Sequence, residues 1–247
     1  MKKVSVILPT YNEAGNIQKL IAAILKQLKP ISVKPEIIVV DDNSPDGTAK
    51  KVKNLPVKLI VRKNQRGLAT AILKGIKQST GSIIVIMDTD FNHQPRDLPL
   101  LLKPILQKKA DLVIGSRYIK GGGMHVSEAG AFQFLASKYG NYFTNKILLG
   151  LPVHESLSGF LAFDKKVLKR LNLKQIFKGY GEYCIRLLYY VDQQGFSLTE
   201  IPVIYGKRQY GQSKSRLFKM MIDYFFTALR LRINGIILQK APYDINR

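Results

Sequence analysis

Short runs of β-branched and aliphatic residues alternate with helical patterns up to about residue 116, and this alternation restricts the fold more than any other feature of the chain. The expected strands are Val4–Leu8, Ile37–Val40, Val57–Val61, Ile83–Met87 and Leu112–Ile114. Between them, apolar residues recur at helical spacing over 17–28, 48–52 and 68–76. Such alternation is typical of an α/β fold, in which a mostly parallel sheet is covered by helices on both faces.

The second half of the chain has a looser pattern. A glycine-rich stretch, Lys120–Gly123, predicts a loop, and helices are expected over about 131–149 and 182–192. At 247 residues, the chain has the length of a single α/β domain or of one domain with an appendage.

The chain is strongly basic. Lysine and arginine number 39 against 17 aspartates and glutamates, which gives a formal net charge of +22. Because 46% of the residues are hydrophobic, the composition excludes a disordered polycation and predicts a packed protein that attracts anions. The single cysteine, Cys184, cannot form an internal disulfide, and three scattered histidines give no zinc-binding pattern. We therefore expect a reducing compartment.

Two carboxylates, Asp88 and Asp90, directly follow the expected strand Ile83–Met87. Ligands of open α/β sheets bind at such carboxyl ends of strands, and carboxylate oxygens suit Mg²⁺ or Mn²⁺. Asn92 could add a neutral oxygen. A cation held by one or two carboxylates usually completes its shell with substrate phosphates, which points to a nucleoside diphosphate. The alternative is that the aspartates solvate a loop or cap a helix near Asp97.

Two common nucleotide-binding motifs are absent. The segment after the first strand is Pro9–Gly15, which lacks the glycine fingerprint of dinucleotide-binding proteins, and no phosphate-binding loop ending in Gly-Lys-Ser/Thr occurs anywhere. The sequence therefore argues against a dinucleotide-dependent oxidoreductase and against a P-loop protein.

Three segments resemble the family 2 inverting glycosyltransferases of the GT-A fold: Leu8–Glu13 (LPTYNE), Val39–Thr48 (VVDDNSPDGT) and Asp88–Asp90. Gly115–Tyr118, Ser158–Phe160 and Arg208–Lys214 (RQYGQSK) are similar to elements of the polyprenyl (dolichyl) phosphate mannosyltransferases within that family. The resemblance covers roughly residues 4–230.

The resemblance implies a role for each matching residue. The donor-binding residues would be Pro9, Tyr11, Glu13, Val40, Asp42, Asp88, Thr89, Asp90, Arg208 and Lys214. Asp88, Asp90 and Asn92 would hold Mg²⁺ or Mn²⁺, and the acceptor phosphate would meet Arg117, Ser137, Lys138 and Ser213. The catalytic residues would be Asp88, Asp90 and Arg117.

The resemblance implies transfer of a hexose, in the first place mannose from GDP-mannose, onto a polyprenyl phosphate to give a β-linked lipid phosphate sugar. A glucosyltransferase using UDP-glucose is the alternative. Three departures from the family pattern, Gln133, Glu155 and Arg186, also leave open a non-catalytic binder of nucleotide sugar. The charge of +22 leaves open a nucleic-acid binder, although no motif for reading nucleic acid is present.

The expected domain division is a catalytic domain over 1–214 and a basic C-terminal helix or tail over 215–247. An apolar stripe at helical spacing consists of Leu217, Met220, Met221, Tyr224, Phe225, Ala228 and Leu231. Beside basic residues, it predicts either an amphipathic helix in the interface of an anionic membrane or a core helix. Charged residues interrupt 217–238, which argues against a membrane span. We expect a cytoplasmic protein that binds peripherally to the cytoplasmic face of a membrane. This location is compatible with a separate membrane protein as a partner.

Overall fold

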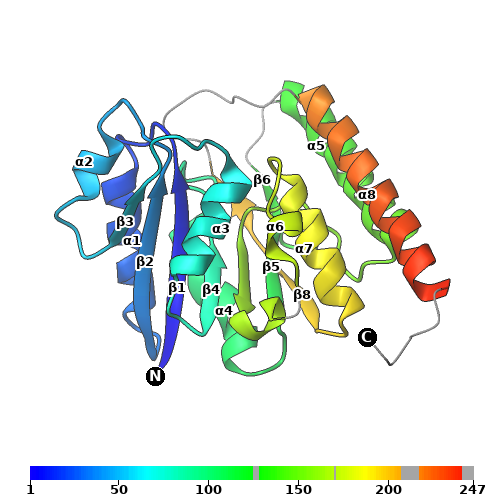
Figure 1. The fold of residues 1–247 in the computed structure, drawn as a ribbon, viewed down its shortest axis with the longest axis horizontal. Helices are drawn as coiled ribbons and strands as arrows, with labels where there is room; N and C mark the ends of the chain where they lie inside the picture. Colours follow the sequence, from blue (N-terminus) through cyan, green and yellow to red (C-terminus); the bar gives the residue numbers. More distant parts are fainter. Residues whose placement is uncertain (125–127, 170, 207–216, 241–247) are drawn as a thin grey trace.

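The computed structural model describes residues 1–124, 128–169, 171–206 and 217–240, without the side chains at 128–130, 132, 217–219, 221 and 235–240 (Figure 1). Its central sheet has seven strands in the order β3-β2-β1-β4-β7-β5-β8. The strands are β1 (Lys2–Thr10), β2 (Val33–Asp41), β3 (Lys58–Val61), β4 (Ile83–Ile86), β5 (Leu112–Ser116), β7 (Leu161–Asp164) and β8 (Leu198–Pro202). Strand β7 pairs antiparallel with both neighbours, and the other pairings are parallel. A two-stranded sheet joins β6 (Gly123–Met124) to β9 (Ile204–Tyr205).

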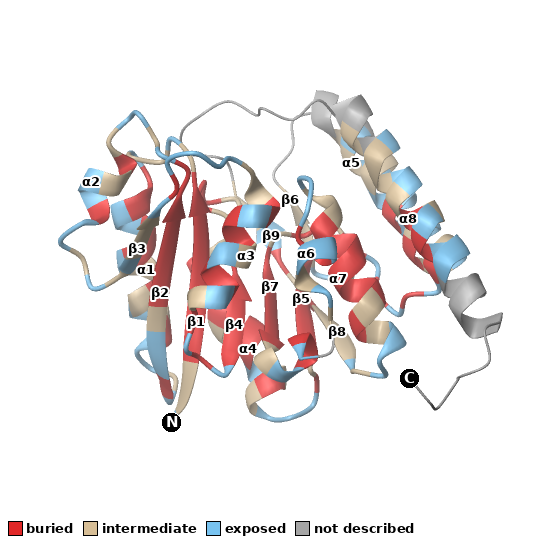
Figure 2. Ribbon diagram, in the orientation of Figure 1, coloured by how far each residue is buried: buried red, intermediate tan, exposed pale blue. Residues whose placement is uncertain are grey.

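Both faces of the central sheet are buried, because side chains alternate between two helical layers. Val6 of β1 packs with α1 (Ile17–Leu28), α2 (Thr48–Val52) and α4 (Leu98–Leu106). Its neighbour Ile7 packs with α3 (Leu68–Gln78) and α7 (Glu182–Gln193) on the other face. Figure 2 accordingly shows the central strands almost wholly buried. The expected α/β architecture and its first five strands are confirmed, with end shifts of at most two residues except at β2, which begins four residues earlier than expected.

The structure of the second half of the chain differs more from what the sequence predicts. The helix expected at 131–149 is α5 (Glu128–Tyr142), followed directly by a π-helical segment, η2 (Phe143–Leu149). Strands β7 and β8 were not expected, because each is only four or five residues long and neither shows a clear alternation. The short elements η1 (Pro95–Asp97), η3 (Lys165–Leu168) and α6 (Leu173–Ile176) complete the described structure.

The C-terminal helix α8 (Leu217–Lys240) lies beside α5 (Figure 1) and contacts α7 and η2. Ala228 and Leu231, two members of the expected membrane-facing stripe, are 0% and 5% exposed. For these two residues the core-helix alternative applies, since they share a core cluster with α7. None of the helices within the described ranges is both long and apolar enough to cross a membrane.

Candidate active site

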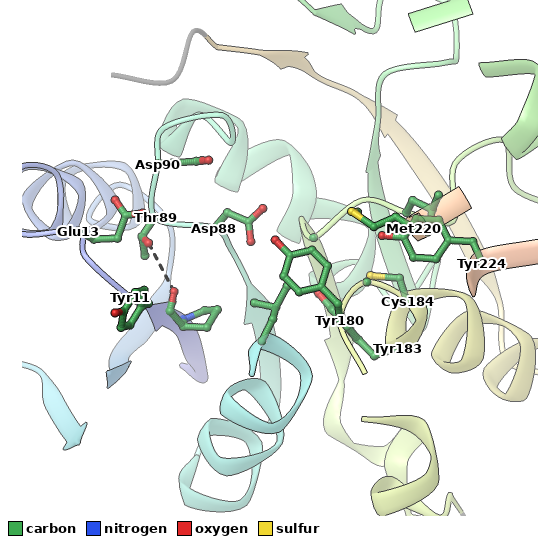
Figure 3. Close-up of a pocket in the computed structure, with 15 residues that line it drawn as sticks. Tyr11, Glu13, Asp88, Thr89, Asp90, Tyr180, Tyr183, Cys184, Met220 and Tyr224 are labelled. Carbon is green, nitrogen blue, oxygen red and sulfur yellow. Dashed lines mark hydrogen bonds between the residues drawn. The ribbon is translucent and has the colours of Figure 1, made fainter. Parts of the chain in front are cut away.

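A pocket of about 240 Å³ opens at the carboxyl ends of β1 and β4. Its lining comprises Pro9, Tyr11, Glu13, Leu68, Asp88, Thr89, Asp90, Leu157, Gly159, Tyr180, Gly181, Tyr183, Cys184, Met220 and Tyr224. In Figure 3, Asp88 stands between a side with Tyr11, Glu13 and Thr89 and a side with tyrosines, Cys184 and Met220. Six of the expected donor-binding residues therefore meet in one place.

The loop that carries the aspartates is held in a strained shape by its own hydrogen bonds. The Asp90 carboxylate accepts from the Asn92 main-chain N–H (3.0 Å) and from Asn92 Nδ2 (2.9 Å). These bonds enclose Phe91, whose φ of 64° is unfavourable for a bulky side chain. On the other side, a Cβ at Gly159 would lie 3.1 Å from both carboxylate oxygens of Asp88. A side chain at Gly159 would therefore displace the Asp88 carboxylate by a few tenths of an ångström.

The aspartate loop offers oxygen ligands to a divalent cation. Among the residues that the structure describes, no group of three or more His, Cys, Asp or Glu side chains could hold a metal ion by itself. The Asp88 side chain is 37% exposed, and Asn92 donates through Nδ2, so the oxygen it can offer to a cation is Oδ1. Two carboxylates and one amide oxygen fit a Mg²⁺ or Mn²⁺ ion that completes its shell with phosphates and water.

Asp42 has a different environment from the one expected of a donor-binding side chain. Its Oδ1 accepts from Arg62 Nε (2.6 Å) and its Oδ2 from the Gly67 main-chain N–H (2.8 Å). Arg62 also donates to Thr70 Oγ1 and to the Gly67 carbonyl, both at 2.9 Å. Asp42 and Val40 are not among the described residues that line the pocket. Asp42 therefore fixes the loop before α3, from which Arg66 places its guanidinium 3.6 Å from the centroid of the Tyr11 ring.

Replacing Asp42 by alanine is expected to lower the free energy of unfolding by about 3 kcal/mol, because Arg62, whose side chain is 4% exposed, would lose its carboxylate. Urea denaturation measures this. Asp46 is the matched control. It lies exposed at the same edge of the sheet and accepts hydrogen bonds from the main-chain N–H groups of Ala14 and Thr48. Asp46→Ala should lower the free energy of unfolding by about 1 kcal/mol. Equal losses in the two variants would contradict the assignment.

Arg117 lies in a second, separate cluster. Its Nε donates to Glu155 Oε1 (2.8 Å), its Nη2 contacts the same oxygen, and its main-chain N–H donates to Oε2 (2.6 Å). The guanidinium also lies over the rings of Tyr118 (4.9 Å) and Tyr205 (4.5 Å). Burial alone would lower the pKa of Arg117, but Glu155 and the two tyrosines raise it above its ordinary value. Arg117 thus keeps its charge inside the protein.

Of the other expected acceptor residues, Ser137 joins this cluster and Lys138 does not. The Ser137 hydroxyl is 2.7 Å from the Tyr118 hydroxyl, whereas Lys138 is exposed on α5. The three departures from the family pattern lie in different environments. Glu155 is the partner of Arg117, Gln133 is exposed, and Arg186 donates to the carbonyls of Ile176 and Lys178, away from the pocket.

His93 and Tyr205 connect Asp88 of the pocket with the Arg117 cluster, and the sequence analysis missed both. The Asp88 main-chain N–H donates to His93 Nδ1 (3.1 Å), and His93 Nε2 is 3.0 Å from the Tyr205 hydroxyl. Burial lowers the pKa of His93 to about 4, so the ring is neutral and its proton lies on Nε2. Tyr205 in turn bonds Ser158 Oγ (3.0 Å) and lies under Arg117.

Arg208, Ser213 and Lys214 lie outside the described residues. Of the described residues nearest to this segment, Gly206 donates its main-chain N–H to the Asn92 carbonyl (2.9 Å), and Met220 lines the pocket.

The comparison with known families decides the identity. The model of Glycosyl transferase family 2 matches residues 5–171, which include both aspartates, Arg117 and Glu155. The chain belongs to glycosyl transferase family 2. The sheet with its single antiparallel strand β7 is the GT-A fold of such glycosyltransferases.

Curated relatives of this family 2 chain include three similar proteins. A dolichol-phosphate mannosyltransferase of Pyrococcus furiosus is 36% identical over 93% of this chain and 63% of its own length. A polyprenol monophosphomannose synthase of Mycolicibacterium smegmatis is 33% identical over 85% of this chain and 79% of its own length. A dolichol-phosphate mannosyltransferase of Saccharomyces cerevisiae is 31% identical over 89% and 83%. The chain thus spans less than two thirds of the Pyrococcus protein.

Solved structures show the same fold. Glucosyl-3-phosphoglycerate synthase from Mycobacterium tuberculosis, in complex with Mn²⁺, UDP and phosphoglyceric acid, superposes with a TM-score of 0.69 at 23% identity, covering 94% of this chain and 78% of that chain. Its complex with Mn²⁺, UDP-glucose and phosphoglyceric acid gives a TM-score of 0.66 at 20% identity, covering 94% and 80%.

Proposed function

We propose that this chain transfers a mannosyl group from GDP-mannose to a polyprenyl (dolichyl) phosphate, with inversion at the anomeric carbon. The observation that carries the proposal is the similarity, at 31–36% identity over 85–93% of the chain, to proteins named dolichol-phosphate mannosyltransferase and polyprenol monophosphomannose synthase. The pocket supports it, because carboxylates suited to a metal-bound diphosphate lie beside an aromatic wall.

The acceptor needs no strong general base. The second ionisation of a phosphate monoester lies near pH 6, so at neutral pH the nucleophilic oxyanion already exists. This oxygen attacks the anomeric carbon, the bond from that carbon to the diphosphate oxygen breaks, and the electron pair leaves with the nucleoside diphosphate. The work left to the protein is to align the two phosphates and to neutralise their charge.

Arg117 orients the acceptor phosphate. Among the described residues, its side-chain hydrogen bonds run through Nε and Nη2 to Glu155, so Nη1 is the group that it can offer to a phosphate. Ser137 lies next to it through Tyr118, and Ser213 adds a hydroxyl, whereas Lys138 is exposed on α5 outside this cluster. Because His93 and Tyr205 join this cluster to Asp88, the acceptor and donor sites are held in a fixed relation.

Tyr11, Glu13, Thr89 and the loop fixed by Asp42 hold the nucleotide, and Asp88, Asp90 and Asn92 hold Mg²⁺ or Mn²⁺ at the diphosphate. When bound, the ion supplies positive charge that stabilises the leaving group. The solved relative with Mn²⁺ and UDP supports this choice of cofactor. Arg208 and Lys214 add positive charge to the same diphosphate.

Transfer of labelled sugar from GDP-mannose to a polyprenyl phosphate in detergent, with Mg²⁺ or Mn²⁺ and with a chelator, tests the proposal. UDP-glucose is the parallel donor. A metal-dependent, β-linked mannolipid supports the proposal. Transfer of glucose alone would replace it by a glucosyltransferase, and retention of configuration or the lack of any transfer would contradict it.

We also propose that α5, η2 and α8 bind the cytoplasmic face of an anionic membrane, so that residues 1–214 carry the reaction and 215–247 contribute to membrane contact. We define the α5/α8 surface as the exposed residues Leu135, Tyr139, Tyr142, Phe143, Ile147, Ile222, Phe225, Phe226 and Ile233. Lys138, Arg230 and Arg232 are exposed on the same helices. Apolar and aromatic residues next to basic ones suit an anionic lipid interface, and a membrane protein partner could meet the same surface.

The double variant Tyr139→Ser/Ile147→Ser is expected to reduce binding to anionic vesicles about tenfold, since it removes side chains that are 67% and 62% exposed. Vesicle sedimentation at two salt concentrations measures this. Leu100→Ser is the matched control, because Leu100 is 43% exposed on α4, which packs on the other face of the sheet. Unchanged vesicle binding, or an equal loss in the control, would contradict the membrane proposal.

A further inference from the structure

One buried hydroxyl at the pocket, that of Tyr183, has among the described residues no partner stronger than the weakly hydrogen-bonding Cys184 thiol. Within the described part of the chain, four buried side-chain polar atoms lack a hydrogen-bond partner: Asn16 Oδ1, Asn145 Oδ1, Ser156 Oγ and the Tyr183 hydroxyl. Of these residues, Tyr183 lines the pocket that contains Asp88 and Asp90. A polar group left unpaired inside a protein destabilises the fold, so its retention calls for an explanation.

Packing fixes the Tyr183 ring without help from its hydroxyl. The residue stands at the start of α7, is 1% exposed and stacks on Phe177 with ring centroids 5.6 Å apart. The nearby Cys184 thiol, a weak hydrogen-bonding group, gives its proton to the Ser158 carbonyl (3.2 Å). Burial raises the pKa of Tyr183, so the phenol stays protonated and can both donate and accept. Phenylalanine would fill the same space.

The position of Tyr183 indicates what the hydroxyl meets. In Figure 3, the nucleotide side of the pocket carries Tyr11, Glu13 and Thr89, and Tyr183 lies across Asp88 from them, with Tyr180, Cys184 and Tyr224. The group of a nucleotide sugar that follows the diphosphate is the hexosyl ring. This ring has apolar C–H faces suited to tyrosine rings and hydroxyls suited to an unpaired phenol.

We propose that the Tyr183 hydroxyl forms a hydrogen bond with a hydroxyl of the transferred hexose and thereby contributes to the choice of sugar. The inference rests on the proposed function for the presence of a nucleotide sugar in the pocket. Sites that pair a buried polar group with a substrate hydroxyl discriminate strongly against analogues that lack it.

Calorimetric binding to Tyr183→Phe in the presence of Mn²⁺ and without acceptor tests the inference. We expect GDP-mannose to bind about tenfold more weakly to the variant than to the unchanged protein. GDP alone should bind both equally, and the melting temperature should stay the same or rise. Tyr189→Phe, the same substitution on the same helix but outside the pocket lining, is the matched control and should change neither affinity.

Monodeoxy analogues of GDP-mannose identify the hydroxyl concerned. One analogue should bind the unchanged protein about tenfold more weakly than the parent donor, and Tyr183→Phe should bind that analogue and the parent equally. Unchanged GDP-mannose affinity in the variant, an equal loss for GDP, or a lower melting temperature with no loss of sugar affinity would overturn the inference. A protein that binds GDP-mannose as expected but transfers nothing to polyprenyl phosphate would refute the proposed function and leave this inference standing.

Discussion

Asp90→Asn is expected to reduce metal-dependent sugar transfer roughly a thousandfold and to leave the melting temperature almost unchanged. The loss follows because an amide cannot replace an anionic metal ligand, and a metal ion at a diphosphate stabilises the departing charge by several kcal/mol. The fold should survive, because the Asp90 carboxylate bonds Asn92 of its own loop, and an asparagine oxygen can still accept from that main-chain N–H. Initial rates over a range of Mn²⁺ concentrations measure the effect.

Asp97→Asn is the control for this prediction. Asp97 follows the same loop, precedes α4 and is not among the described residues that line the pocket. Its replacement should leave both the rate and the Mn²⁺ dependence unchanged. Full Mn²⁺-dependent turnover in Asp90→Asn would remove Asp90 from the metal site, and a large fall in its melting temperature would show that Asp90 is mainly a structural residue of the loop.

The pocket lining at the ends of β1 and β4 could be predicted from the sequence, because its residues directly follow strands. Pro9–Glu13 follows β1 and Asp88–Asp90 follows β4, and neighbouring parallel strands bring their carboxyl ends to one edge of the sheet. Asp42 shows the limit of this reasoning. It too follows a strand, but its partners Arg62 and Gly67 lie in the loop after β3, and only the folded chain shows that they occupy both carboxylate oxygens.

The acceptor side could be predicted only in part. Arg117 and Glu155 are 38 residues apart and His93 and Tyr205 are 112 apart, so no local pattern pairs them. The antiparallel strand β7, placed between β4 and β5, is what brings Glu155 and Ser158 to this edge of the sheet. In α8, helical periodicity identified an apolar face correctly but could not show that α7 covers Ala228 and Leu231.

Replacing Arg117 by alanine is expected to have two effects. It should lower the free energy of unfolding by about 3–5 kcal/mol, because Glu155, which is 0% exposed, would be left as an unpaired buried charge. It should also raise the KM for polyprenyl phosphate while GDP binding stays the same, since Arg117 belongs to the acceptor cluster and not to the pocket lining. Urea denaturation and transfer kinetics measure the two effects separately.

The double variant Arg117→Met/Glu155→Gln separates the structural role from the acceptor role. Methionine fills the space of the arginine stem, and glutamine removes the buried charge but keeps an oxygen for the main-chain N–H of residue 117. Replacing a buried ion pair by neutral groups of similar volume is often close to neutral for stability, so most of the lost unfolding free energy should return. Glu155→Gln alone, which leaves a buried guanidinium without its carboxylate, should be less stable than the double variant.

The double variant should regain stability but not the use of polyprenyl phosphate as acceptor. No cation is left beside Tyr118 and Ser137 to hold the phosphate. Arg117→Lys adds a graded test. A lysine keeps the charge but cannot bond Glu155 through a planar fork, so its acceptor KM should lie between those of the unchanged protein and the double variant. If the double variant recovers both stability and acceptor use, Arg117 serves the fold alone and the acceptor phosphate binds elsewhere.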